Sequence, residues 1–98
     1  MNEKIEYLLN HLDHYIEQTI FEVLNDSDYD PQYSAVTLYN LLVCYLDVTH
    51  SLGLNDNIAS PEAYMRNKCF TEDEILLVKK KKEKESKYYI GVQYSDHE

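Results

Sequence analysis

The chain has 98 residues and a formal net charge of −9, with its acids segregated from its bases. Residues 1–65 contain eleven Asp or Glu and a single base, Lys4, whereas six of the nine bases lie in residues 79–87. We expect residues 1–98 to form a single small acidic domain, because a chain of this length buries only one core. Its negative field attracts basic partners and repels phosphate, which argues against direct binding of nucleic acid.

Neither a secretory signal nor a membrane-spanning segment is expected. The N-terminus lacks a basic segment followed by an apolar core, and no apolar stretch approaches the roughly twenty residues that a membrane span requires. The two cysteines, Cys44 and Cys69, lack the spacing of a zinc site or a disulfide scaffold. We therefore expect reduced thiols, no cofactor and a cytoplasmic location.

The first predicted element is a helix over about residues 3–24. Apolar residues recur there at three- and four-residue steps, at Ile5, Leu8, Leu9, Leu12, Ile16, Ile20, Val23 and Leu24. This spacing is typical of one apolar stripe on a helix. Asn2 is placed to cap the N-terminus, and the polar residues 25–28 compete with helical hydrogen bonding and end the helix.

A second helix is predicted over about residues 31–52. Asp30 and Pro31 suit an N-cap and a first-turn proline, and Gly53 suits the left-handed position after the helix. The short connection from the first helix favours an antiparallel helical hairpin. The second helix is apolar on more than one side, because its main stripe is flanked by Val36, Val43, Cys44 and Val48. That surplus must be covered by the C-terminal third or by another subunit.

A short third helix is predicted from Ser60 and Pro61 to about Lys68. No internal repeat is visible along the chain. The last four residues, 95–98, are expected to be loose.

Two signals in the C-terminal third conflict. Thr71 and Glu74 match a capping box, which favours a helix from Glu72. Residues 88–94 are instead rich in β-prone side chains. We expect a β-hairpin, with residues 75–81 paired to 87–94 across a charged turn at 82–86, ahead of a helix with a frayed tail. The expected fold class is thus mainly α, an antiparallel helical hairpin plus a short third helix, with a C-terminal β-hairpin (α+β).

Two sets of side chains have some features of metal sites. Residues Asp26, Asp28 and Asp30 alternate as in the first half of a calcium loop, but Pro31 and Thr37 stand where the turn glycine and the bidentate acid belong. His11, His14 and Glu17 recur at three-residue steps on one helix edge. We interpret the first set as a linker with a helix cap and the second as the margin of the apolar stripe, so no metal is expected.

Enzyme activity is not expected from this sequence. A nucleophilic cysteine needs a nearby base and an electropositive setting. Cys44 lies in an apolar helix, with its nearest histidine, His50, six residues away. Cys69 is closer to positive charge but has no identifiable histidine partner. The chain has only two glycines, and neither forms part of a phosphate-binding loop.

The predicted binding site is the polar side of the first helix. Its carboxylates lie about one helical turn, roughly 5 to 6 Å, apart, and a tyrosine among them offers a rigid ring for recognition. An ordinary solvated helix face is the competing interpretation. The candidate partner-binding residues are Glu3, Glu6, Tyr7, Asn10, Asp13 and Glu17.

These features favour a small acidic protein that binds another protein. Our hypothesis is a stoichiometric inhibitor, of the immunity or anti-defence type, that acts on a basic or nucleic-acid-handling partner. The composition, rich in residues of A+T-rich codons, is typical of a low-GC bacterium or its phage. The alternative is an accessory or scaffold subunit that self-associates, as a homodimer, through the apolar face of the second helix.

Overall fold

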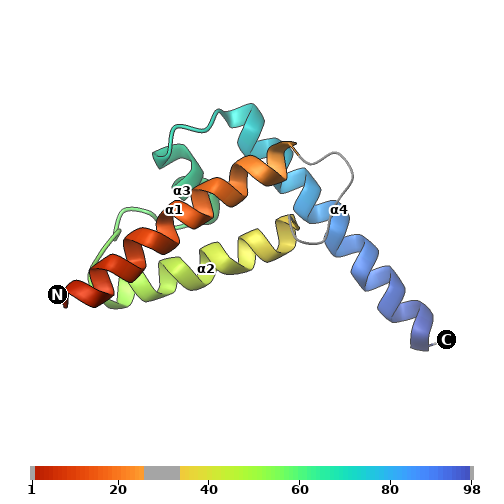
Figure 1. Ribbon diagram of the computed structural model, residues 1–98. Coiled ribbons are helices and arrows are strands. Elements are labelled where there is room, and N and C mark those ends of the chain that lie inside the picture. Colours follow the sequence, from red (N-terminus) through yellow and green to blue (C-terminus); the bar gives the residue numbers. More distant parts are fainter. Residues whose placement is uncertain (1, 26–33, 98) are drawn as a thin grey trace.

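The computed structural model describes residues 2–25 and 34–97, with side-chain surroundings given up to residue 86. These residues form four helices and no strand: α1 (Glu3–Asn25), α2 (Ala35–Ser51), α3 (Pro61–Asn67) and α4 (Glu72–His97). Helices α1 and α2 run antiparallel, and α4 crosses the end of this pair and projects beyond it (Figure 1). None of the helices in the described ranges is both long enough and apolar enough to cross a membrane.

The caps predicted for two helices are confirmed. At the start of α1, Asn2 Oδ1 accepts a hydrogen bond of 2.7 Å from the Lys4 N–H. At the start of α3, Ser60 Oγ accepts one of 3.1 Å from the Ala63 N–H, with Pro61 in the first turn. Each cap supplies an acceptor for an N–H that has no partner within its own helix.

The predicted start of the second helix is wrong. Helix α2 begins at Ala35, because Ser34 is extended (φ −65°, ψ 130°) and its hydroxyl caps the Thr37 N–H. The Asp30 and Pro31 positions lie outside the described residues. The predicted end is confirmed, since Gly53 has φ +74°. Its N–H donates to the His50 carbonyl and the next N–H donates to Thr49, the two bonds of a Schellman motif.

A second Schellman motif ends α3. The Phe70 N–H donates to the Met65 carbonyl at 3.1 Å and the Cys69 N–H donates to Arg66 at 3.0 Å. Cys69 occupies the left-handed position, with φ +69°, where glycine is normally preferred. This turn leads directly into α4.

The predicted β-hairpin is wrong, because α4 covers both of its strands and its turn. The helix starts with the reciprocal capping box: Thr71 N–H donates to Glu74 Oε1 at 2.8 Å, and Glu74 N–H donates to Thr71 Oγ1 at 3.1 Å. Ile75 and Val78, three residues apart, then bury their side chains in the core. β-Propensity depends strongly on context, and the described helices provide no strand with which residues 87–94 could pair.

The core lies where α1, α2 and α4 meet, with α3 against it. Its fully buried side chains from α1 come only from the second half of that helix. The main core residues are Ile16, Ile20, Val23, Leu38, Leu42, Tyr64, Met65, Phe70, Ile75 and Val78. Residues 3–8 of α1 consequently extend past the core, and this arrangement determines what the predicted binding residues can contact.

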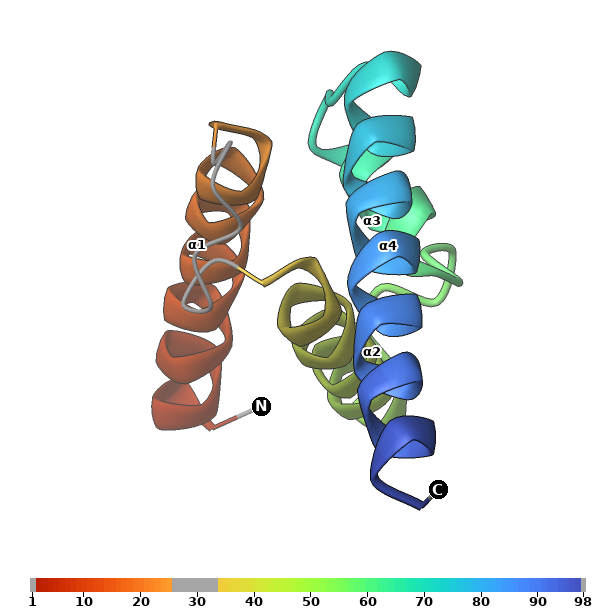
Figure 2. The ribbon, with the colours of Figure 1, turned by 90° about the vertical axis from the view of Figure 1, so that its right-hand side faces the viewer.

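The lysine-rich segment 79–87 belongs to α4 and contacts the other helices. Lys81 Nζ donates to the Val23 carbonyl, and Lys82 Nζ lies 4.8 Å from the centre of the Tyr39 ring. Figure 2 shows α4 on one side of the molecule and α1 on the other, with α2 between them. Lys81 and Lys82 therefore join α4 to α1 and α2, and the charged turn predicted at residues 82–86 is helical instead.

Candidate partner-binding site

The six predicted binding residues fall into two groups. Those in the first two turns of α1 are exposed, and those closer to the core are half-buried. The exposed residues are Glu3, Glu6, Tyr7 and Asn10, and the half-buried ones are Asp13 and Glu17. The division follows from the fold, because the first fully buried residue of α1 is Ile16.

The N-terminal end of α1 is exposed all the way round. Every residue from 3 to 8, which we call the exposed N-terminal segment, is solvent-accessible. Glu3 and Glu6 lie in the first turn, where the helix dipole favours carboxylates. Tyr7 is 69% exposed, and its ring stacks on that of His11 with centroids 6.1 Å apart. This segment thus offers negative charge and a large aromatic surface on one stable helix.

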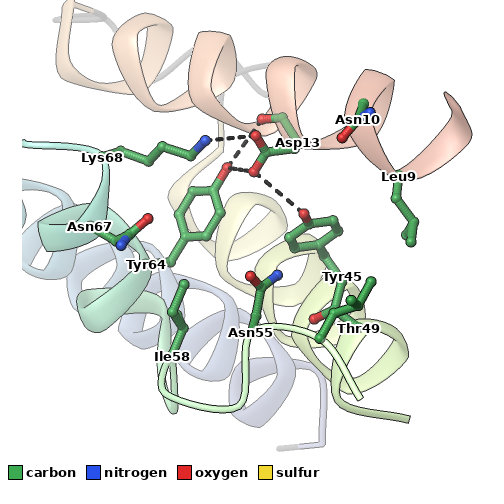
Figure 3. A pocket seen from close by; sticks show the side chains of 11 residues that line it. Leu9, Asn10, Asp13, Tyr45, Thr49, Asn55, Ile58, Tyr64, Asn67 and Lys68 are labelled. Carbon is green, nitrogen blue, oxygen red and sulfur yellow. Dashed lines mark hydrogen bonds and ion pairs between the residues drawn. The ribbon is translucent and has the colours of Figure 1, made fainter. Parts of the chain in front are cut away.

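Asp13 instead points into the molecule, where its carboxylate joins three helices (Figure 3). Its Oδ1 accepts hydrogen bonds from the Tyr64 hydroxyl at 2.7 Å and the Tyr45 hydroxyl at 3.4 Å. Its Oδ2 lies 2.6 Å from Lys68 Nζ, and the side chains of this ion pair are only about one quarter exposed. Charge-assisted bonds of this kind are stronger than neutral ones. The Asp13 cluster, formed by Asp13, Tyr45, Tyr64 and Lys68, therefore fixes α1 against α2 and α3.

The two tyrosines of the Asp13 cluster remain hydrogen-bond donors well above neutral pH. Burial, followed by the hydrogen bond to Asp13, raises the pKa of Tyr64 above its usual value. Burial and the nearby Asp13 charge raise the pKa of Tyr45 in the same direction. Both hydroxyls stay protonated because a tyrosinate here would be desolvated and repelled by the carboxylate.

A cavity of about 290 Å³ opens beside the Asp13 cluster, between α1, α2 and α3. Its lining includes three amide side chains, Asn10, Asn55 and Asn67, together with Thr49 and the cluster itself. These groups can donate and accept hydrogen bonds, but the lining includes no cysteine or histidine that could act as nucleophile or base. The charged side chains that line this cavity, Asp13 and Lys68, belong to the Asp13 cluster and already have a structural role in joining the helices.

His50, the histidine closest in sequence to Cys44, holds the α2–α3 loop. Its Nε2 lies 3.0 Å from the Asn55 carbonyl oxygen and 2.8 Å from that of Ile58. Both neighbours are carbonyl oxygens, which can only accept hydrogen bonds, so Nε2 must carry a proton. Nε2 is therefore a donor and cannot act as a base for Cys44. Cys44 and Cys69 are free and exposed. The expectation that the chain is not an enzyme stays a prediction.

Among the side chains that the structure describes, in residues 2–25 and 34–86, no three His, Cys, Asp or Glu are grouped closely enough to hold a metal ion. His11, His14 and Glu17 thus do not form such a group. The residues of the calcium-like pattern, Asp26, Asp28 and Asp30, lie outside the described part of the chain.

Comparison of the chain with protein-family models, curated proteins and solved structures gave no match. Its function must therefore be inferred from its side chains. Sequence reasoning grouped Asp13 with the outward-facing acids and missed its partners in α2 and α3. One available signal was its spacing, because Asp13 lies four residues after Leu9 and three before Ile16, next to the apolar stripe.

Proposed function

We propose that this chain binds a protein with a basic surface in a stoichiometric complex and inhibits it, as immunity and anti-defence proteins do. Nucleic-acid-handling proteins are the expected target class, because their binding surfaces are basic. The observation that carries the proposal is the exposed N-terminal segment, where Glu3, Glu6 and Tyr7 all face solvent on a regular helix. The carboxylates steer the partner during association, and the tyrosine ring anchors it.

The remaining predicted residues have different roles in this proposal. Asn10 is exposed and continues the polar side one turn beyond Glu6, and Glu17 extends the negative potential towards the core. Asp13 holds α1 in position, because its carboxylate already binds Tyr64 and Lys68. A partner therefore approaches mainly along the first two to three turns of α1.

The proposed setting is the cytoplasm of a bacterium, or of a bacterium infected by phage. Free, exposed Cys44 and Cys69 suit a reducing compartment. The net charge of −9 disfavours direct binding to nucleic acid, so the partner in this proposal is the protein that handles it.

The test is quantitative capture of the partner. The wild-type chain is immobilised, exposed to host lysate, and the bound proteins are identified by mass spectrometry. The proposal expects a basic protein, present in equimolar amount in the purified complex. Its association rate constant should fall about tenfold or more between low and physiological salt, because steering by surface charges is screened within a Debye length of about 8 Å.

Two double variants with the same change in net charge separate a specific site from general acidity. Glu3→Lys with Glu6→Lys should abolish capture, whereas Glu22→Lys with Asp56→Lys, at exposed positions elsewhere, should leave it nearly unchanged. Circular dichroism checks that both remain folded. Equal loss of binding in the two variants, or retained binding in the first, contradicts the proposed site.

A further inference from the structure

One side of the α1–α2 pair is not covered by the other described helices. Helices α3 and α4 contact α2 and lie on the same side of α1 (Figure 2). We call the uncovered side the outer face. Its apolar residues are Ile5, Leu8, Leu12 and Tyr15 of α1, with Leu41 and Val48 of α2 and the adjoining Leu52.

Helical geometry places these residues on one side. Asp13 and Thr49 both line the cavity beside α3. At 100° per residue, Leu8 lies about 140° round α1 from Asp13, and Val48 lies about 100° round α2 from Thr49. Because the helices are antiparallel and the Tyr45 hydroxyl reaches Asp13, the N-terminal half of α1 runs beside the C-terminal half of α2. The apolar residues of both helices thus form one continuous face.

Several large side chains of the outer face are unusually exposed. Leu8 is 63% exposed, Tyr15 58% and Val48 50%. Leu12 and Leu41 are partly buried and pack against the core beneath them. Single exposed apolar residues are common, but a contiguous group from two helices is characteristic of an interaction surface.

The charges around the outer face indicate what kind of surface it fits. The ionisable side chains that border it are Lys4, His11, Glu22 and Asp47, which are one lysine, one histidine and two acids. Glu6 and Glu17 lie on the opposite side of α1. A partner helix with basic flanks would find little complementary charge at this border. A second copy meets no strong repulsion there, even though the whole chain carries a net charge of −9.

We propose that the outer face binds a second copy of this chain in an isologous dimer, with α1 and α2 of each copy forming a four-helix arrangement. Half-exposed side chains of this size give an apolar area on the order of 500 Å² per copy, so a pair buries about 1,000 Å², near the lower limit of a specific interface. The dimer is therefore weak and concentration-dependent. Dimerisation goes beyond the proposed inhibitor function and does not depend on that function, because the acidic side of α1 faces away from the interface in both copies.

This face differs from the self-association surface expected from sequence. That expectation used α2 alone and included Val43. Val43 is 47% exposed, but it lies about 140° round the helix from Val48, away from the outer face. Half of the proposed interface comes instead from α1, and Val43 provides a matched control on the same helix.

Sedimentation velocity of the full chain over a concentration series tests the dimer without any basic protein present. The wild type should shift from monomer to dimer in the micromolar to submillimolar range. Leu8→Glu and Val48→Glu should each weaken dimerisation by about tenfold or more, whereas Val43→Glu should change it by less than about twofold. All three positions are exposed, so circular dichroism should show an unchanged helical fold.

Two results would overturn the dimer. One is a wild-type chain that stays monomeric up to roughly 1 mM, because its dissociation constant would then lie above the range expected for this interface. The other is a dimer that Val43→Glu dissociates as strongly as Val48→Glu, which would place the interface on another side of α2. Loss of dimerisation in Leu8→Glu and Val48→Glu alone supports the outer face.

Discussion

Lys81 and Glu85 stand one helical turn apart on α4 and cap two helix ends of opposite polarity. Lys81 Nζ donates to the Val23 carbonyl in the last turn of α1. The Glu85 carboxylate accepts from the N–H groups of Ala35 and Val36 in the first turn of α2, each at 3.1 Å. A cation suits the negative end of one helix and an anion suits the positive end of the other. One side of α4 thus binds the end of α1 and the start of α2 together.

Removing the Glu85 carboxylate should destabilise the fold. Glu85→Ala leaves the Ser34 hydroxyl and two backbone N–H groups without this acceptor, and we expect a loss of about 2 kcal/mol in the free energy of unfolding. Urea denaturation at neutral pH measures it. Glu83→Ala, at an exposed position on the same helix, should cost less than about 0.5 kcal/mol. Similar losses in both variants would mean that the inter-helix cap contributes little.

The Asp13 cluster should be sensitive to the loss of a single oxygen atom. Tyr64→Phe removes the donor of the 2.7 Å hydrogen bond to Asp13 and should lower the free energy of unfolding by about 1.5–3 kcal/mol, the usual range for a bond to a charged group. Tyr15→Phe, on the exposed surface of α1, is the matched control and should have almost no effect. A Tyr64→Phe variant as stable as the control would contradict the structural role of the cluster.

Stability should fall at alkaline pH because of buried tyrosines. Burial, with added repulsion from Glu62 or Asp13, raises the pKa of Tyr39, Tyr45 and Tyr64 above the ordinary value of 10.0. The unfolded chain then loses these hydroxyl protons at lower pH than the folded chain does. The protonated tyrosines make their full contribution to the free energy of unfolding below about pH 10. This contribution is lost as pH rises further, by up to about 1.4 kcal/mol per pH unit for each tyrosine.

Chemical denaturation between about pH 8 and pH 11 tests this linkage. Lysines titrate in the same range, so the informative quantity is the difference between wild type and Tyr64→Phe. The wild-type free energy of unfolding should fall more steeply with pH, because the variant lacks one of the three shifted groups. Parallel curves would show that Tyr64 ionises alike in the folded and unfolded chains.

The left-handed residue after α3 offers a stabilising substitution. Cys69 has φ +69° and is exposed, so Cys69→Gly should relieve the conformational cost of a side chain there and raise the free energy of unfolding by about 0.5–1 kcal/mol. The same change at Cys44, inside α2, should have the opposite sign, because glycine weakens a helix interior by up to about 1 kcal/mol. Thermal melts of the two variants should therefore move in opposite directions.

Local signals in the sequence correctly predicted three of the helices and several of their ends. The apolar spacing of α1, the Ser60 cap and the left-handed Gly53 each act within a few residues, where steric and hydrogen-bonding preferences dominate. The start of α2 was missed although its cap is local, since the Thr37 N–H donates to Ser34 Oγ, because Asp30 and Pro31 offered a competing cap signal nearby. Only the Glu85 carboxylate that joins this cap, 51 residues away, leaves no local pattern.

The C-terminal third shows how a correct local signal can be outweighed by a misleading one. The capping box at Thr71 predicted the start of α4, but the β-prone residues 88–94 favoured a strand. Ile75 and Val78 are buried along one side of α4, and Lys81 and Glu85 continue its contacts with α1 and α2. These tertiary contacts favour the helix. The β-propensities of residues 88–94 alone do not include such contacts.

The candidate site was predictable only where it is exposed. Glu3, Glu6 and Tyr7 are solvent-accessible, as helical periodicity suggested. Asp13 has the same polar character but binds Lys68, 55 residues later in the chain. Which acids remain available to a partner thus depends on tertiary contacts that charge patterning does not reveal.

The double cap by α4 has a consequence for chain connectivity. Lys81 binds the end of α1 and Glu85 binds the start of α2. The alignment of these two helices therefore does not rely solely on the peptide link between them. A polypeptide severed between α1 and α2 should therefore stay assembled as two fragments and elute as one species under native conditions.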